Sequence, residues 1–531
     1  MEIRDIIKEG KQTALGIEFG STRIKAVLID SKGDVLASGS HEWENRWENG
    51  IWTYSMDDIT SGLVSAYSDL KKDVKEKYGI TLTGFGAMGI SAMMHGYLAF
   101  DKDDNLLVPF RTWRNATTGD AAEILTKEFN FNIPLRWSVA HLYHAILNKE
   151  EHVSKIAFVT TLAGFIHYKL TGKKVLGVGD ASGMFPIDSK IRDYNREMKD
   201  KFNKLIAPCG FDWDFDKVFP KVLVAGEDAG TLTKEGAAFL DPQGDLECGM
   251  PVCPPEGDAG TGMTATNSVA VRTGNVSAGT SVFSMIVMEH DLKKVHPEID
   301  VVTTPSGDSV AMVHCNNCTN EINAWAGIFK EFADVMGASV NMGDIYTKLF
   351  NLALTGEPEC GGLLGFNYLS GEPVSGFEEG RPLFVRNADS RFNLANFMRL
   401  QLYMALAALK GGNDILMKEE DVKVDKMLGH GGYFKTTGVG QRMLSAALDT
   451  EISCMETAGE GGAWGIAVLA LYEISKAKDE SLSDFLNDKI FAGMKATTLK
   501  ADKSDVEGFN KFMERYKKGL KIEASAIENL N

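Results

Sequence analysis

The chain of 531 residues lacks the features that mark secreted and membrane-spanning proteins. Its seven cysteines are few, odd in number and scattered, unlike the dense and even set that cross-links a small secreted domain. The longest apolar run, near residues 464–472, is far shorter than the roughly 20 residues that span a bilayer. We therefore expect free thiols in a reducing compartment and a chain without a membrane span.

An excess of positive charge is also lacking. The formal net charge of −17 argues against nucleic acid and anionic membranes as partners, because both are bound through basic surfaces. It does not exclude ATP, whose phosphates need only local donors and a metal ion. Residues 1–11 contain three acidic residues and no apolar core of a signal peptide. We expect a cytoplasmic protein, and the sequence leaves the oligomeric state open, with a homodimer as one candidate.

No proline-rich or serine-rich linker divides the chain, although its length exceeds the size at which one hydrophobic core keeps growing. Apolar residues make up 44% and charged residues 24%, which is ordinary for a folded protein. We expect two large domains, residues 1–268 and 269–531, joined by a direct crossover near residues 265–272. The charged segment after residue 481 is expected to form a helical cap at the C-terminus.

Two hairpin patterns of the same kind lie about half a chain apart. In residues 13–30, two apolar runs flank Gly20-Ser21-Thr22, and residues 274–287 repeat this pattern around Gly279-Thr280-Ser281. Their repetition predicts two related domains, each beginning with a hairpin. Between and after them, strands are expected to alternate with helices, which indicates an α/β protein. The expected strands are 35–38, 85–91 and 426–428, and the expected helices are 56–77, 392–410 and 463–475.

Phosphoryl transfer requires donors for the ATP oxygens and a base beside the acceptor hydroxyl, and the sequence offers residues for both tasks. In the two turns, glycine lets the backbone approach an anion, while serine and threonine add hydroxyl donors. Asp258, in the segment Gly257-Asp258-Ala259-Gly260, is a candidate general base that is ionised at neutral pH. Taken singly, such features are more often ordinary hairpin turns and a helix N-cap.

Two further segments follow expected strands. Met94-His95-Gly96 comes after the strand at 85–91, at a strand end where α/β proteins commonly bind ligands. Gly429-His430-Gly431-Gly432 follows the strand at 426–428, and its glycines let the backbone pass close to a flat ring or a ribose. A lone histidine at a strand end is more often a structural hydrogen-bonding residue, and a glycine cluster alone is a weak signal. The order of all these segments carries more information.

In this order, the segments resemble the motifs of the FGGY family of carbohydrate kinases, closest to its xylulokinase-like branch, over about residues 15–471. The family's first phosphate motif is similar to residues 18–22 with Lys25, and its sugar-facing segment is similar to residues 89–96. Its Tyr-x-Leu-Thr-Gly and Asp-Ala-Ser-Gly motifs are similar to residues 168–172 and 180–183. Its catalytic loop, second phosphate turn and adenosine loop are similar to the segments that begin at Gly257, Gly279 and Gly429.

The resemblance implies an α/β fold of two ribonuclease-H-like domains, of the actin, hexokinase and Hsp70 type, that flank a cleft for ATP and sugar. The first domain would bind the sugar and the second the nucleotide, with Mg²⁺. Asp258 would be the general base. The implied sugar contacts are Met94, His95, Trp113, Asn115 and Asp258. The implied phosphate contacts are Gly20, Ser21, Thr22, Lys25, Gly279, Thr280 and Ser281. The implied adenosine contacts are Gly429, Gly431, Gly432 and Thr436, and Glu18 and Asp258 would hold Mg²⁺ through water.

The implied reaction is the ATP-dependent phosphorylation of a sugar hydroxyl, with a ketopentose such as xylulose as the expected acceptor. Two departures from the family pattern bear on it. Glu18 stands where the family has Asp, and Trp113-Arg114-Asn115 replaces Trp-Asn-Asp, which exchanges a carboxylate for an amide. The alternatives are a kinase for ribulose, a polyol or gluconate, and a non-catalytic, actin-like ATP-binding sugar sensor.

Overall fold

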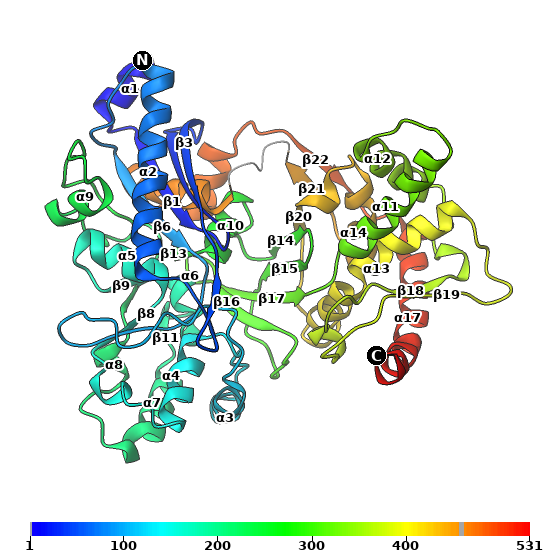
Figure 1. Cartoon of the computed structure of the whole chain (residues 1–531), viewed down its shortest axis with the longest axis horizontal. Coiled ribbons are helices and arrows are strands. Elements are labelled where there is room, and N and C mark those ends of the chain that lie inside the picture. The colour runs from blue at the N-terminus through cyan, green and yellow to red at the C-terminus, as the bar shows by residue number, and fades with distance from the viewer. Residues whose placement is uncertain (1–2, 456–460, 531) are drawn as a thin grey trace. The chain divides into compact units, whose positions relative to one another are not determined.

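The computed structural model describes residues 3–455 and 461–530, which form two compact units (Figure 1). The first unit contains the described residues of Met1–Val269, Val301–Val310 and Ala458–Gly493, and the second those of Ala270–Asp300, Ala311–Thr457 and Met494–Asn531. The chain leaves the first unit next to residue 268, the expected end of the first domain, and returns to it twice. The assignment of sugar to the first domain and nucleotide to the second stays a prediction.

The first unit is built on a mixed sheet of strand order β13-β6-β1-β2-β3. The neighbours β1, β2 and β3 are antiparallel, whereas β6 and β13 run parallel to β1. The predicted first hairpin is confirmed, because the Gly20-Ser21-Thr22 turn joins β1 to β2. The strands are β1 (Thr13–Phe19), β2 (Arg23–Asp30), β3 (Val35–Glu42), β6 (Ala87–Ala92) and β13 (Glu256–Gly257).

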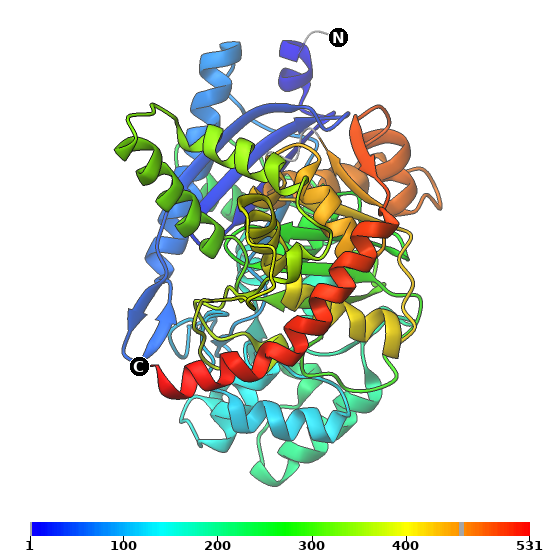
Figure 2. The same ribbon diagram turned by 90° about the vertical axis from the view of Figure 1, so that its right-hand side faces the viewer.

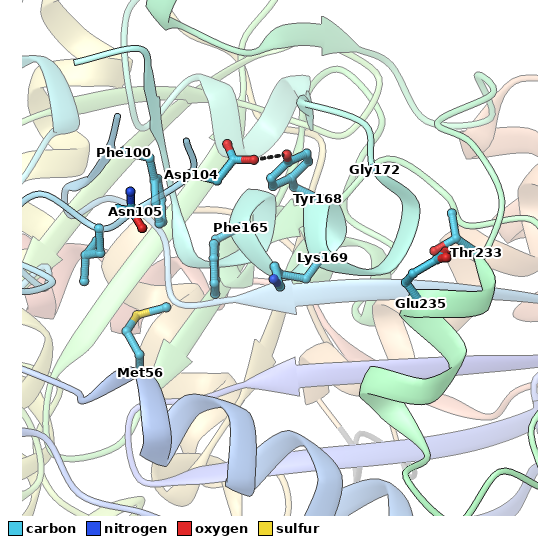
Figure 3. A pocket seen from close by; sticks show the side chains of 11 residues that line it. Met56, Phe100, Asp104, Asn105, Phe165, Tyr168, Lys169, Gly172, Thr233 and Glu235 are labelled. Atoms are coloured by element: carbon cyan, nitrogen blue, oxygen red, sulfur yellow. Dashed lines mark hydrogen bonds between the residues drawn. The ribbon is translucent and has the colours of Figure 1, made fainter. Parts of the chain in front are cut away.

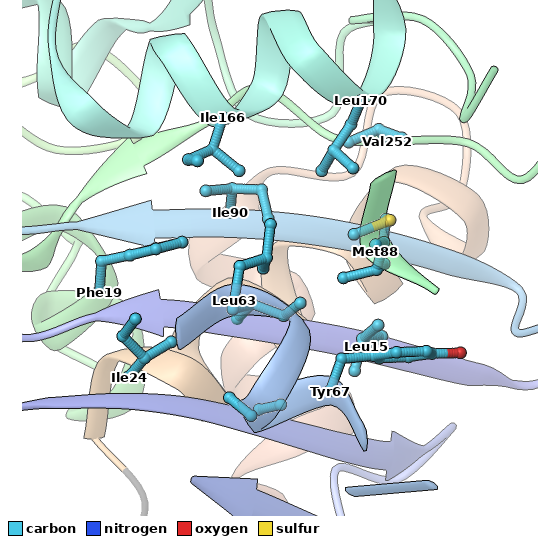
Figure 4. Packing of buried hydrophobic residues seen from close by; sticks show 14 of the residues in the cluster. Leu15, Phe19, Ile24, Leu63, Tyr67, Met88, Ile90, Ile166, Leu170 and Val252 are labelled. Atoms are coloured by element: carbon cyan, nitrogen blue, oxygen red, sulfur yellow. The ribbon is translucent and has the colours of Figure 1, made fainter. Parts of the chain in front are cut away.

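One face of this sheet is covered by α2 (Met56–Tyr78) and α5 (Leu162–Thr171). α2 begins at the N-cap Ser55, whose hydroxyl accepts a hydrogen bond from the N–H of Asp58, and ends at Gly79 with a left-handed φ of 70°. The predicted helix at 56–77 is thus confirmed. Figure 4 shows Leu63 and Tyr67 of α2 packed against β1 and β6, with Ile166 and Leu170 of α5 above β6. The helical spacing of apolar residues seen in the sequence is the buried face of α2.

The other face of the sheet packs against α10 (Asp258–Ala265) and α15 (Gly461–Ser475). A Cβ atom on Gly16 of β1 would lie 2.0 Å from the carbonyl oxygen of Ala463, so only glycine lets α15 lie directly on the strand. α15 comes from the half of the chain expected to form the second domain, and it belongs to the first unit because its apolar residues cover β1 and β6.

The smaller elements of the first unit lie around this core: α1 (Ile3–Glu9), β4 (Arg46–Glu48), β5 (Ile51–Thr53), β7 (Leu98–Phe100), α3 (Gly119–Phe129), α4 (Ser138–Leu147), β8 (Phe158–Thr160), β9 (Val175–Gly177), α6 (Val178–Ala181), β10 (Ile187–Asp188), β11 (Asp193–Tyr194), α7 (Arg196–Ile206), α8 (Phe215–Val218), β12 (Lys221–Leu223), α9 (Lys234–Leu240) and α16 (Leu482–Phe485).

The second unit repeats this plan. Its sheet contains the strand order β17-β15-β14-β20-β21, which matches the order β3-β2-β1-β6-β13 of the first unit. The predicted second hairpin is confirmed by β14 and β15, and β20 and β21 run parallel to β14. This shared order agrees with the prediction of two related domains. The strands are β14 (Thr273–Ala278), β15 (Val282–Val287), β17 (Ser309–Cys315), β20 (Lys426–His430), β21 (Ile452–Met455) and, beyond β21, β22 (Ala496–Leu499).

The helices of the second unit surround a long buried helix, α13 (Leu394–Asp414), which confirms the helix predicted at 392–410. The C-terminal helix α17, seen along its length in Figure 2, packs on α14 and β18, and its Asp505 is paired with Arg399 and Arg442. The further elements are α11 (Asn320–Val335), α12 (Met342–Ala353), β18 (Leu364–Phe366), β19 (Leu383–Val385), α14 (Val439–Leu448) and α17 (Lys503–Asn529). Among the described helices, none has both the length and the apolar composition that crossing a membrane requires.

Candidate active site

Three of the predicted segments meet at one edge of the first sheet. Parallel strands end at the same edge, so the residues that follow β1, β6 and β13 lie side by side. In the strand register, Glu18 lies opposite Ser91, which lies opposite Glu256. The N–H of Met94 donates to Oδ1 of Asp258 at 3.1 Å. The first turn, the predicted sugar-facing segment and the candidate base therefore belong to one constellation in the first unit.

Asp258 is the first residue of α10, and Gly257 occupies the N-cap position. Its carboxylate accepts hydrogen bonds from the N–H of Met94 and from that of Ala259, and the residue is exposed. The protein packed around Asp258 displaces water and raises the pKa of its carboxyl, while the N–H donors act in the opposite direction. An exposed carboxylate with a raised pKa is suited to accept a proton from a bound hydroxyl.

Glu18 lies near Asp258 at the end of β1. Loss of water around its carboxyl, and then the charge of Asp258, raise the pKa of Glu18 to about 7, against the lowering effect of Lys25. Lys25 is the residue opposite Glu18 in β2. The Oε2 atom of Glu18 accepts from the N–H of Ala463 at 3.3 Å, at the start of α15. A Cβ atom on Gly462 would lie 2.3 Å from Oε1, so this glycine makes room for the longer acidic side chain.

The carboxylate oxygens of Glu18 and Asp258 are suitable ligands for a magnesium ion. The charges of Glu18 and Asp258 act on one another, and a divalent cation between oxygen ligands relieves such repulsion. Within residues 3–455 and 461–530, no group of three or more acidic, histidine or cysteine side chains is placed to hold a metal ion alone. Magnesium commonly binds to one or two carboxylates and completes its shell with water and substrate phosphates. The two carboxylates fit that requirement.

His95 is buried and has a left-handed φ of 69°, which is uncommon for a residue other than glycine. Its Nδ1 pairs with the carbonyl oxygen of Gly183 at 3.1 Å. Burial, and next the positive charge of Arg136, lower the pKa of His95 to about 3, so the ring is neutral. Because a carbonyl only accepts, Nδ1 carries the proton and Nε2 is the acceptor atom of the ring.

The other two predicted sugar contacts differ in their surroundings. Asn115 is buried, and its amide is used within the protein: Oδ1 accepts from the N–H of Trp52 at 2.9 Å, and Nδ2 donates to the carbonyls of Trp52 and Thr112. Trp113 is exposed. The hydrogen bonds of Asn115 hold β5 in place, and a contact of either residue with a sugar stays a prediction.

Two acidic residues beside the candidate base were not predicted as site residues. Glu256, in β13, is 1% exposed, and its carboxylate accepts from the N–H groups of Gly179 (3.3 Å) and Asp180 (2.9 Å) of α6. Asp180, which is also buried, accepts from the hydroxyl of Thr161 at 2.6 Å. Burial raises the pKa of Asp180 to about 7 and that of Glu256 to about 8. The one sequence signal for the buried position of Glu256 beside Asp258 is that a glutamate interrupts an otherwise apolar stretch.

In the second unit, the predicted phosphate turn and adenosine loop are also neighbours. β14 runs parallel to β20, with Ser277 opposite His430, so Gly279-Thr280-Ser281 and the glycine loop leave the sheet at the same edge. Gly431 has a φ of 100°, and a Cβ atom there would lie 2.5 Å from the carbonyl oxygen of Ala278. Only glycine permits this approach. Thr436 follows in the loop before α14, where its carbonyl accepts from the N–H of Val439. Contacts of these residues with a nucleotide stay predictions.

The first unit also contains a pocket of about 710 Å³ (Figure 3), which is separate from the group formed by the first turn, the predicted sugar-facing segment and Asp258. Phe100 and Phe165, whose ring centroids are 5.2 Å apart, form its apolar side, and the hydroxyl of Tyr168 donates to Asp104 beside it. Lys169 and Glu235 add charges of opposite sign. None of the predicted site residues lines this pocket.

The fold and these constellations define a two-domain α/β protein with glycine-rich turns and a carboxylate at the strand ends. Comparison with known proteins gives its family. Residues 13–258 match the N-terminal domain and residues 274–474 the C-terminal domain of the FGGY family of carbohydrate kinases. The chain belongs to this family and is a carbohydrate kinase, as the sequence motifs indicated. Kinases of this family use ATP as the phosphoryl donor.

Relatives of this chain include sugar kinases with different acceptors. Xylulose kinase of Haemophilus influenzae is 22% identical over 515 residues, which cover 94% of this chain and 98% of that protein. The structure of ligand-bound xylulose kinase from Lactobacillus acidophilus is similar with a TM-score of 0.75 at 18% identity, covering 97% of this chain and 99% of that one. Gluconate kinase from the same organism gives 0.75 at 17%, covering 96% and 98%. The predicted actin- and hexokinase-like fold is confirmed.

Proposed function

We propose that this kinase transfers the γ-phosphoryl group of ATP to a hydroxyl of a ketopentose such as xylulose, with Asp258 as the general base. The observation that carries the proposal is the hydrogen bond between the N–H of Met94 and the Asp258 carboxylate. It joins the candidate base to the segment that resembles the family's sugar-facing motif. The likeness to xylulose kinases over almost the whole chain supports the choice of acceptor.

In the proposed reaction, the sugar lies against Met94, His95 and Trp113, with Asn115 supporting this region. Nε2 of neutral His95 accepts a hydrogen bond from a sugar hydroxyl and so fixes its orientation. Asp258 takes the proton of the acceptor hydroxyl as its oxygen attacks the γ-phosphorus. The bond between the γ-phosphorus and the bridging oxygen of ADP breaks in the same step. The products are the sugar phosphate and ADP, and the proton remains on Asp258 until it leaves to solvent.

Nucleotide contacts are proposed for each of the two units. Gly20, Ser21, Thr22 and Lys25 of the first unit, and Gly279, Thr280 and Ser281 of the second, are proposed to bind the phosphates through N–H groups, hydroxyls and one ammonium. Gly429, Gly431, Gly432 and Thr436 are proposed to bind the adenosine. Glu18 and Asp258 would hold Mg²⁺ through water, and the ion, when bound, would neutralise charge on the phosphate oxygens.

An aldonate such as gluconate is a second candidate acceptor. The positive charge of Arg136 acts on both His95 and Asp258, since it lowers the pKa of each. The carbonyl of Arg136 also accepts the N–H of Gly96, which places its backbone at the sugar-facing segment. A guanidinium in this region matches a carboxylate on the acceptor. The likeness to a gluconate kinase is as close as that to a xylulose kinase of the same organism.

A coupled assay of ADP release tests the proposal with a panel of pentuloses, hexuloses, polyols and aldonates. We expect kcat/KM to be highest for a ketopentose. A higher value for an aldonate would select the second candidate and refute the first. If no acceptor of the panel raises ADP release above the rate measured without acceptor, kinase turnover on these acceptors is refuted, and a sensor that binds ATP without catalysis is supported.

A further inference from the structure

Two aromatic residues hold the first glycine-hydroxyl turn by its carbonyl groups. The indole Nε1–H of Trp43 donates to the carbonyl oxygen of Gly20 at 2.7 Å, and the hydroxyl of Tyr54 donates to that of Ser21 at 2.6 Å. The backbone N–H of Trp43 donates to the carbonyl oxygen of Thr22 at 3.2 Å. Three consecutive carbonyls of the turn are therefore fixed by one pair of residues.

The pair itself is held rigidly. The rings of Trp43 and Tyr54 are stacked, with centroids 4.0 Å apart and an interplanar angle of 22°. Trp43 also contacts Phe19 edge to face, and Tyr54, which is 1% exposed, packs against Phe110. Phe19 and Phe110 belong to the hydrophobic core of the first unit. The two side-chain donors are thus anchored to the core and not to a mobile surface.

Fixing the carbonyls also fixes the amides. A trans peptide unit is planar, and its C=O and N–H groups point in opposite directions. When the carbonyls of Gly20 and Ser21 point to the aromatic pair, the N–H groups of Ser21 and Thr22 must point away from it. Neither N–H has a hydrogen-bond partner within the described part of the chain, and both residues are exposed. Successive N–H groups directed to one side form a binding site for an anion.

We propose that Trp43 and Tyr54 are positioning residues that direct the N–H groups of Ser21 and Thr22 at the phosphates of the nucleotide. The inference rests on the proposed function, in which this turn contacts the phosphates, and it does not depend on the sugar. The ligand chemistry is that of a nucleoside polyphosphate. A nucleoside without phosphates makes no use of the turn.

The test removes one donor at a time. Trp43→Phe and Tyr54→Phe retain aromatic rings but lose the donor to Gly20 and to Ser21, respectively. Matched controls come from the same unit: Trp47→Phe changes an exposed tryptophan, and Tyr78→Phe removes a hydroxyl that donates to the carbonyl oxygen of Leu36. The dissociation constants of ATP with Mg²⁺ and of adenosine are measured by calorimetry on the full chain, and thermal melting checks that each variant is folded.

We expect Trp43→Phe and Tyr54→Phe each to weaken ATP binding about fivefold, and the double variant to weaken it further, while the affinity for adenosine stays at the wild-type value. The control variants should bind both ligands as the wild type does. The inference is overturned if the double variant, still folded, binds ATP like the wild type, or if ATP and adenosine lose affinity equally. A wild type that binds ATP no more tightly than adenosine would instead refute the phosphate contacts of the proposed function.

Discussion

The departure at Glu18 leads to a sharp prediction at Gly462, which is not among the predicted ligand contacts. Gly462 lies at the start of α15, where a Cβ atom would lie 2.3 Å from Oε1 of Glu18, 2.8 Å from its Cδ and 2.9 Å from Oγ1 of Thr261. Contacts this short force a neighbour to move. We expect Gly462→Ala to displace the Glu18 carboxylate from the N–H of Ala463 and so disturb its position beside Asp258.

The size of the effect follows from the cost of overpacking. An inserted methyl group in a well-packed region costs about 1–3 kcal/mol. If this cost falls on the transition state, kcat/KM decreases by about 5- to 150-fold. An alanine inside a helix is favoured over glycine by about 1 kcal/mol, so the variant should not unfold more readily for lack of helix propensity. Gly327→Ala, in α11 with no atom near the added Cβ, is the matched control and should keep wild-type activity.

A second substitution tests the cause. Glu18→Asp shortens the acidic side chain by one methylene and withdraws it from the methyl group of the new alanine. The double variant Glu18→Asp with Gly462→Ala should therefore be at least several-fold more active than Gly462→Ala alone, a coupling that independent sites do not show. The assay is steady-state ADP release with the best acceptor at saturating Mg²⁺. Wild-type kcat/KM in Gly462→Ala, or no recovery in the double variant, would refute the reasoning.

Two further predictions concern stability. Lys71 is buried and donates to both carboxylate oxygens of Asp241, which is 1% exposed, so Lys71→Met leaves a buried charge without its partner and should cost about 3–5 kcal/mol in urea unfolding. Lys71→Met combined with Asp241→Leu should recover part of that loss. A loss below about 1 kcal/mol in the single variant would contradict the view that Lys71 stabilises the buried charge of Asp241. Burial raises the pKa of Glu372, which accepts from Asn317, to about 7 from 4.5. The folded protein thus keeps a proton between these values that the unfolded chain releases, so this residue's contribution to stability falls as pH rises through this window, by up to about 3 kcal/mol. Relative to the wild type, Glu372→Gln should become more stable between pH 5 and pH 8, and a difference that does not change with pH would refute this account.

Local sequence patterns predicted the elements whose residues pair with near neighbours. The hairpin of β1 and β2 and the helix α2 follow directly from alternation, helical spacing and a glycine turn, because each is stabilised within a few dozen residues. β13 was not predicted as a strand, because two residues are too few to show a period. The return of α15 to the first unit was missed for a different reason. Its contact with Glu18 joins residues 445 positions apart, which no local pattern reveals.

The candidate site shows the same division. Asp258 and the two turns could be predicted as site residues from the sequence because each occupies a motif with a fixed local spacing. Glu256 was missed because its carboxylate is bound by the N–H groups of α6, and this pairing depends on how distant segments pack. The departure at Glu18 is accommodated by Gly462, whose lack of a side chain makes room for the longer acid. That relation exists only in three dimensions.

The most direct test of the central claim is the activity of Asp258→Asn. The amide keeps the size of the side chain and can still accept from the N–H of Met94, but it cannot take a proton from the acceptor hydroxyl. With the best acceptor of the panel, kcat should fall by roughly 10²- to 10⁴-fold, while the dissociation constant of ATP, measured by calorimetry, stays near the wild-type value. A variant that binds ATP normally and keeps a kcat within about threefold of the wild type would contradict the assignment of Asp258 as the general base.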